Sequence, residues 1–338
     1  MSVPMDVSLE RLELFSLLQR MQMVKAPMCI LAIVFCLWTK FPSLDWSRLD
    51  AVELFAGMNE ITRAAQRSGR TAMSYDRDYD QHGGMDFNST IGFLHAVVLI
   101  LRLGDGAQHT TAPVCSSYGF INSGTSGRST WQPLGNIYVC SVKDGNTMVA
   151  RQVLLLYLCH SKGVFFMLEN PRGSHLEKHP CFQALLRDIP IYRTCVELGD
   201  FGGNTAKAVW LYSNYPCIHE LQAFARANRN TDVKKDTLVE YKINESGERK
   251  VYGIKAALRE SQSYPRAFGE AVNSLYLRHK AKFRQQAADL RQQAQYEHVD
   301  YAVLDAYVKY AADTTGLCKA DLYSLADLAA VFGFLWQA

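Results

Sequence analysis

The sequence predicts a doubly wound α/β domain whose sheet is mostly parallel, and three observations lead to that prediction. Residues 51–55 form a mostly apolar run that ends at Ala56-Gly57, and a helical pattern follows at once. Strand and helix patterns alternate from residue 51 onward, as in parallel sheets. Residues 164–168 are wholly apolar, as expected for a strand buried on both faces.

Composition sets the class of protein. The 338 residues could form one large domain or two smaller ones, and 48% hydrophobic residues exclude a disordered chain. The net charge is only +3, so any surface for nucleic acid must be a local patch. The nine cysteines are scattered and include no C-x-x-C pair, which argues against a disulfide scaffold or a zinc site. We therefore expect an intracellular protein of the nucleus or cytoplasm.

Residues 1–50 predict a helical N-terminal extension. Residues 8–24 have helical periodicity, and residues 26–38 form an unbroken apolar run. A membrane span needs about 20 residues, so a packing helix is favoured over a membrane anchor, which stays as a minor alternative.

The helix after the first turn extends to about Ser68. Residues 71–75 then predict a second strand that ends in Asp76, about 20 residues beyond the turn, where nucleoside-binding α/β folds accept ribose hydroxyls. The alternative is that Asp76, Asp78 and Asp80 form a solvated acidic turn. Residues 85–87 predict the end of a third strand and place Asp86 there.

Two further strand ends carry candidate chemistry. Residues 108–112 predict a strand that leads into Pro113 and Cys115, and a polar, glycine-rich loop follows. A helix is predicted over residues 147–162. The apolar strand 164–168 delivers Glu169, Asn170 and Arg172, and a carboxylate in that position is costly without a partner, which favours a functional role.

Five motifs in this order resemble the cytosine-C5 methyltransferases. They are Phe55-Ala56-Gly57, Pro113-Val114-Cys115, Glu169-Asn170-Pro171, a region before strand 208–213 that contains Lys207, and a late motif that contains Gly269. The resemblance covers about residues 50–278. It implies a Rossmann-like domain dependent on S-adenosylmethionine (SAM), with a mixed, mostly parallel sheet over residues 51–278.

The resemblance also implies the chemistry. Cys115 would add as a thiolate to C6 of cytosine, which needs a site that lowers the thiol pKa, and Glu169 would assist at the ring. Lys207 joins these as a catalytic residue, and no metal is required. The implied SAM-binding residues are Phe55, Ala56, Gly57, Asp76, Asp86, Pro113 and Gly269. The implied substrate-binding residues are Ser116, Asn122, Asn170 and Arg172.

The target base must leave its stack to reach a buried thiolate, so base flipping or a single-stranded substrate is implied. DNA is the favoured substrate and RNA remains possible. The chain departs from the family at Val114, Pro171 and Glu270. Two alternatives stay open: a silent module that binds SAM or nucleic acid, and Cys115 as a structural thiol.

The family's large target-recognition domain has a small counterpart here. Residues 218–263 form an insertion with a predicted hairpin at 239–243 and 250–254. Residues 279–338 predict a helical C-terminal extension with a basic first part and an apolar stripe that includes Leu325 and Phe332. The two terminal extensions could pack together, form a homodimer or hold a partner protein.

Overall fold

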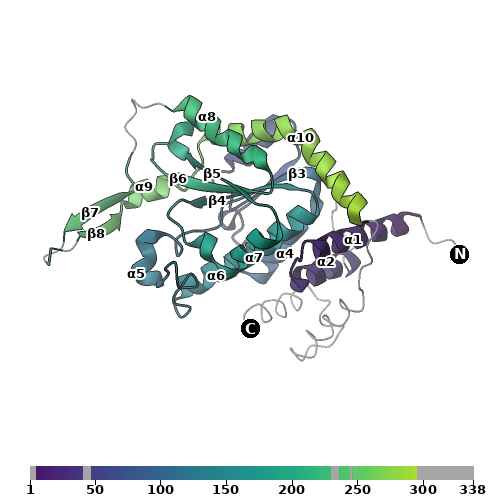
Figure 1. The fold of residues 1–338 in the computed structure, drawn as a ribbon, viewed down its shortest axis with the longest axis horizontal. Coiled ribbons are helices and arrows are strands. Elements are labelled where there is room, and N and C mark those ends of the chain that lie inside the picture. Colours follow the sequence, from purple (N-terminus) through teal and green to yellow (C-terminus); the bar gives the residue numbers. More distant parts are fainter. Residues whose placement is uncertain (1–4, 41–46, 230–235, 244–245, 248, 295–338) are drawn as a thin grey trace.

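The computed structural model describes residues 5–40, 47–229, 236–243, 246–247 and 249–294 (Figure 1). Its centre is a six-stranded sheet with strand order β2-β1-β3-β4-β6-β5. The strands are β1 (Leu49–Leu54), β2 (Ala72–Tyr75), β3 (Leu103–Thr111), β4 (Phe165–Pro171), β5 (Tyr192–Glu197) and β6 (Ala208–Ser213). β1 pairs in parallel with β2 and β3, and β3 with β4, whereas β6 is antiparallel to both neighbours. The predicted mixed, mostly parallel α/β sheet is confirmed.

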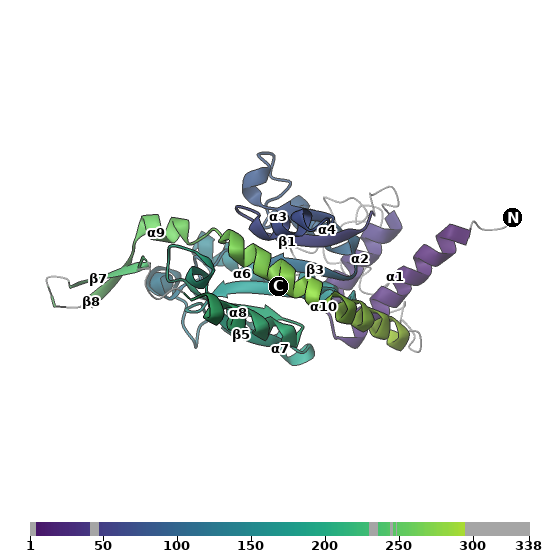
Figure 2. The same ribbon diagram turned by 90° about the horizontal axis from the view of Figure 1, so that it is seen from above.

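Helices cover both faces of this sheet. α4 (Thr90–Arg102), α6 (Cys140–Ser161) and α7 (Pro180–Asp188) lie on one face, and α8 (Glu220–Asn228) and α10 (Arg266–Ala294) on the other (Figure 1). α3 (Glu60–Arg67) packs against α10. Figure 2 shows α10 running obliquely across the sheet. The fold is therefore doubly wound.

β4 shows why this sheet needs helices on both sides. Phe166 and Leu168 belong to the core beneath α4 and α6, while Phe165 and Met167 belong to the core beneath α8 and α10. Side chains alternate between the two faces of a strand, so an unbroken apolar run is stable only when both faces are covered.

The N-terminal extension forms α1 (Met5–Met23) and α2 (Met28–Lys40). Several apolar residues of α2, among them Ile30, Leu31 and Val34, are fully buried in the core shared with α4 and α6. α2 is thus a packing helix, as the sequence favours. Among the described helices, none combines the length and the hydropathy needed to cross a bilayer.

Two segments differ from the sequence prediction. No strand forms at residues 85–87; the chain turns there, with Asp86 Oδ1 accepting from the Asn88 N–H at 3.0 Å, because glycines precede the segment and a helix cap follows it. α6 begins at Cys140 rather than at residue 147 and contains Gly145. A Cβ at Gly145 would lie 2.4 Å from Ser117 Oγ, so the glycine allows helix and loop to pack closely.

The remaining elements lie at the ends of the molecule. β7 (Val239–Ile243) and β8 (Arg249–Gly253) form the predicted antiparallel hairpin, which projects from the body beside α9 (Lys255–Glu260) (Figure 1). α10 continues without a break across residue 278, where the methyltransferase-like domain is expected to end. The predicted apolar stripe with Leu325 and Phe332 lies outside the described residues.

Candidate active site

The turn after β1 is held in an unusual backbone conformation. Phe55, Gly57 and Asn59 all have positive φ, at 58°, 49° and 50°. The Gly57 N–H donates to Asp76 Oδ2 at 2.9 Å, and the Tyr79 hydroxyl donates to the Gly57 carbonyl at 2.6 Å. Two non-glycine residues in the left-handed region carry strain, so these contacts to the end of β2 fix the turn.

The expected cofactor residues surround this turn. The Phe55 ring meets the Phe87 ring edge-on at 5.0 Å, which brings the segment with Asp86 beside it. Ala56 donates its N–H to the Tyr75 carbonyl at 3.2 Å. A Cβ at Gly269 would lie 2.5 Å from the Glu60 carbonyl oxygen, so α10 crosses the start of α3 at closest approach there. Six of the residues expected to bind the cofactor thus lie around one end of β1: Phe55, Ala56, Gly57, Asp76, Asp86 and Gly269.

Several buried acceptors near this turn have no hydrogen-bond partner within the described part of the chain. They are Glu53 Oε1, Asn59 Oδ1 and Asn88 Oδ1. Unpartnered buried acceptors are costly and indicate a missing donor. SAM offers donors of this kind in its ammonium group, its ribose hydroxyls and its adenine amine, so the residues present fit that molecule.

Glu53 lies within β1, and the structure gives it a role that the sequence does not predict. Its Oε2 accepts from the Thr62 N–H at 2.7 Å and from the Thr62 hydroxyl at 2.6 Å, which joins β1 to α3. Burial raises the pKa of Glu53 to about 7, against the lowering effect of the Thr62 bonds. Glu53 and Thr62 are nine residues apart in the sequence, and no local sequence pattern predicts their contact.

Cys115 follows the end of β3, and Glu169 lies near the end of the neighbouring strand β4, at the same edge of the sheet. Thr111 of β3 pairs with Leu168 of β4, and this is the last pair between the two strands. Glu169 comes directly after Leu168, and Cys115 follows four residues after Thr111. Thr111 also pairs with Leu54, which places the Phe55 turn next to Pro113, a buried residue. Strand ends in open α/β sheets commonly carry the functional groups.

Lys207 reaches this edge because β6 runs against the other strands. Its antiparallel pairing with β4 puts the start of β6 beside the end of β4. Lys207 Nζ lies 3.4 Å from Glu169 Oε1 and donates to the Ser261 carbonyl at 3.2 Å. Glu169 is buried, and the ammonium group supplies the partner that such a carboxylate requires.

Tyr264 completes the group, and its role was not predicted from the sequence. Its hydroxyl donates to Glu169 Oε2 at 3.4 Å, and its ring packs against Phe268 at 4.9 Å. Burial, followed by the charges of Glu169 and Glu53, raises the pKa of Tyr264 well above its usual value, so the phenol stays protonated. Tyr264 and Glu169 are 95 residues apart, a separation that no local pattern reveals.

Burial and two nearby charges change the pKa of the Cys115 thiol in different directions. Burial raises its pKa, Lys207 lowers it and Glu169 raises it, with burial the largest effect. The net pKa is above the ordinary value, in contrast to the activated thiolate expected from the sequence. The reason is that the desolvation of a thiolate outweighs one nearby ammonium group.

The two charges near Cys115 are expected to change the pKa of its thiol in opposite directions. We expect Lys207→Met to raise the pKa of Cys115 and Glu169→Gln to lower it, because each variant removes one of the two charges. Iodoacetamide should therefore modify the Cys115 peptide more slowly in Lys207→Met and faster in Glu169→Gln between about pH 7 and pH 9. Cys140 is exposed and serves as the internal control by mass spectrometry. A change of the same sign in both variants would contradict this electrostatic picture.

The expected substrate residues divide into two groups. Asn122 donates from Nδ2 to the Ser116 carbonyl at 2.6 Å and so folds the loop back on the segment after Cys115. Asn170 is buried, and its Nδ2 has no partner in the described residues. Arg172 is exposed and lines a hollow of about 340 Å³ with Cys195, on the β5 side of the sheet. Arg172 therefore lies apart from the Glu169 group in this structure.

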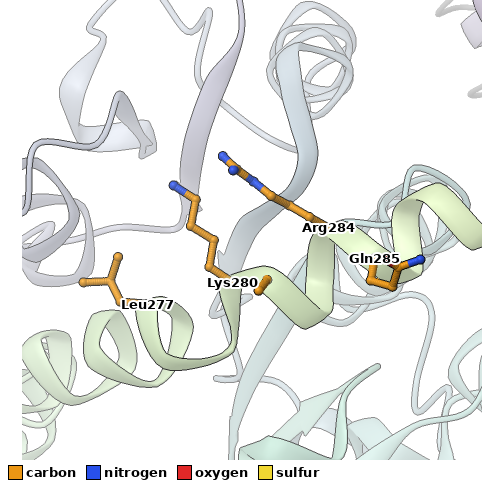
Figure 3. A pocket seen from close by; sticks show the side chains of 5 residues that line it. Leu277, Lys280, Arg284 and Gln285 are labelled. Atoms are coloured by element: carbon orange, nitrogen blue, oxygen red, sulfur yellow. The ribbon is translucent and has the colours of Figure 1, made fainter.

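A second hollow, of about 560 Å³, lies along α10 (Figure 3). Lys280 and Arg284 line it, together with Leu277, and their side chains extend from the same side of the helix (Figure 3). Arg284 packs beside Gly106 near the start of β3, whereas Cys115 follows the end of that strand. This hollow is therefore separate from the candidate active site.

Comparison with known proteins shows likeness in structure but not in sequence. No protein-family model matches the chain, and no curated protein matches it. The crystal structure of the S. pombe Dnmt2 methyltransferase is similar at 14% sequence identity and a TM-score of 0.32. The similarity covers 59% of this chain and 64% of that one, so the chain spans less than two thirds of that protein. The strand order of the sheet and the helices on both of its faces define the fold.

Proposed function

We propose that this chain transfers a methyl group from SAM to C5 of cytosine in nucleic acid, with DNA favoured and RNA possible. The observation that carries the proposal is the meeting of Cys115, Glu169 and Lys207 beside the Phe55–Gly57 turn. A thiol that can attack C6, a carboxylate that can contact the ring and a set of unpartnered acceptors for SAM lie at one edge of the sheet. These are the groups that the reaction requires.

The proposed reaction passes through a covalent bond between Cys115 and C6 of the cytosine. Cys115 gives its proton to water and forms a bond to C6 as a thiolate, and the electron pair of the C5–C6 double bond moves to C5. Glu169, held by Lys207, stabilises the ring as the charge develops. SAM would supply the methyl group as a cationic sulfonium donor. The electron pair at C5 forms the bond to the methyl carbon, and the broken carbon–sulfur bond leaves neutral S-adenosylhomocysteine. C5 then gives its proton to water, the C5–C6 double bond re-forms and the thiolate of Cys115 leaves.

A substrate analogue tests this mechanism directly. An oligonucleotide with 5-fluorocytosine has fluorine where the C5 proton should leave, so the Cys115–C6 bond is expected to persist after methyl transfer. Mass spectrometry of the digested protein should then find the nucleotide on the Cys115 peptide, in the presence of SAM. With ordinary cytosine and labelled SAM, the product should be 5-methylcytosine. An N-methylated base, or an adduct on another cysteine, would overturn the proposal.

The second candidate is a module that binds SAM or nucleic acid without turnover. It is favoured by the raised pKa of Cys115 and by the contacts of both Glu169 oxygens with protein groups, Lys207 and Tyr264. Under this alternative, SAM binds measurably, but neither labelled product nor the 5-fluorocytosine adduct forms with single-stranded DNA, duplex DNA or RNA. The same pair of assays therefore separates the two candidates.

A further inference from the structure

The segment between β3 and α6 exposes aromatic side chains on the surface. We call residues 113–139 the aromatic loop. Trp131 and Tyr138 are 94% and 92% exposed, the highest values among the large hydrophobic residues that the structure describes. Phe120 follows in the same loop at 65%. Aromatic surface of this kind is costly in water and marks a site of interaction.

The aromatic loop is held by an internal arginine rather than left free. The Arg128 guanidinium is fully buried and lies 3.6 Å from the centre of the Tyr118 ring. It donates to Asn146 Oδ1 at 2.8 Å, and to Ser117 Oγ and the Val142 carbonyl at 3.1 Å each. The loop therefore presents its aromatic residues from a fixed frame, which lowers the entropic cost of binding.

The loop lies at the same end of the molecule as the candidate active site. It starts at Pro113, passes through Cys115, and its short helix α5 (Ser123–Ser126) lies near the hairpin end of the molecule (Figure 1). The segment Phe120–Asn122 is in contact with β8. A strand that places one base at Cys115 would therefore run past this loop.

The charges near the loop indicate what kind of molecule it fits. Arg128 is the only charged residue in positions 113–139, and it is buried. Cations lie at the two borders: Phe120 donates its N–H to the carbonyl of Gly173, next to Arg172, and Lys143 follows Tyr138 on the first turn of α6. Both cations are exposed, and in the described structure neither side chain has an ion-pair partner. A loop with exposed aromatic side chains, no exposed charge of its own and cations at its borders matches bases flanked by phosphates.

We propose that the aromatic loop is a stacking surface for unpaired nucleotides next to the target base, with Trp131 and Tyr138 contacting base faces and Arg172 and Lys143 contacting phosphates. This inference rests on the proposed nucleic-acid substrate and makes it narrower: the chain binds single strands, or the unpaired part of a duplex. Stacking tolerates any base, so this surface gives affinity without sequence preference.

The test measures binding of a fluorescent oligothymidylate to the full chain by anisotropy. Trp131→Ala should weaken binding about tenfold, and Trp131→Phe should retain most of it, because stacking needs an aromatic face. Leu277→Ala, an exposed hydrophobic residue on α10, is the matched control and should bind as the parent chain does. A duplex of the same length should bind more weakly than the single strand.

Salt dependence tests the proposed phosphate contacts. Arg172→Gln and Lys143→Gln should each reduce the slope of log affinity against log salt by about 1, whereas Trp131→Ala should leave the slope unchanged.

Binding and methyl transfer are read separately, so each hypothesis can fail alone. Oligonucleotide binding that depends on Trp131, without any methyl transfer, supports the stacking surface and removes the proposed reaction. If the chain transfers methyl groups but Trp131→Ala binds the oligonucleotide as tightly as the parent, the stacking surface is wrong and the proposed reaction stands. Tighter binding of the duplex, or loss of self-association in Trp131→Ala without loss of oligonucleotide binding, also overturns the inference, since the surface would then serve another partner.

Discussion

Replacing Cys115 by alanine is expected to reduce methyl transfer by roughly 10⁴-fold or more, because the variant cannot form the bond to C6 on which every later step depends. C5 of cytosine is a poor nucleophile until C6 carries that bond. The measurement is transfer of labelled methyl from SAM to the best nucleic-acid substrate, with product identified as 5-methylcytosine. The affinity for SAM should change little, since the acceptors of the proposed SAM site lie around the β1 turn.

Cys140→Ala is the matched control for this experiment. Cys140 is an exposed free cysteine at the start of α6, so its loss removes a thiol without touching the Glu169 group. Its activity should equal that of the parent chain. Transfer that persists in Cys115→Ala would show that the methyl acceptor is activated without a thiolate, and the proposed mechanism would be wrong.

Replacing Arg128 by methionine is expected to lower the free energy of unfolding by about 3 kcal/mol, because buried acceptors would lose their donor. The guanidinium serves four acceptors: Ser117 Oγ, Asn146 Oδ1 and the carbonyls of Pro133 and Val142. Methionine has similar length but no donor, so most of the apolar packing is kept. Urea unfolding followed by circular dichroism measures the change.

Arg77→Met is the matched control for the stability measurement. The side chain of Arg77 is 76% exposed, so its unfolding free energy should match that of the parent within about 0.5 kcal/mol. Arg128→Met should also increase proteolytic cleavage between residues 113 and 139 under native conditions, since the loop would lose its internal support. Equal stability of the two variants would mean that water satisfies the acceptors around Arg128.

The sequence predicts the elements whose signals are local. β4 is an apolar run that must be covered on both faces, and β6 has the predicted bounds, Ala208–Ser213. β5 (Tyr192–Glu197) was not predicted, because an edge strand with exposed Tyr192 and Arg193 lacks the apolar continuity of a buried strand. Residues 85–87 were wrongly predicted to end a strand, because Phe87 is buried as a single side chain against Phe55 rather than within a ladder.

The site was predictable where residues follow strand ends and unpredictable where distant segments meet. Cys115 and Glu169 could be placed together because parallel neighbours end at the same edge. The contact of Tyr264 with Glu169, the bond of Lys207 to the Ser261 carbonyl and the burial of Glu53 depend on how the α9–α10 junction and α3 dock on the sheet. Such docking is decided by packing over the whole core, which no short motif encodes.

The two oxygens of Glu169 have a consequence for the size of the molecule that the proposed site would accept. Oε2 accepts from the Tyr264 hydroxyl at 3.4 Å, whereas Oε1 lies 3.4 Å from Lys207 Nζ and has no hydrogen-bond partner in the described structure. An incoming base therefore competes with a hydrogen bond at one oxygen and with the charge of Lys207 at the other. A free nucleoside can displace these contacts only with the binding free energy of its own ring. A base within a strand also has the binding free energy of the neighbouring nucleotides. The proposed site would therefore discriminate by chain length and leave the pool of free cytidine unmodified.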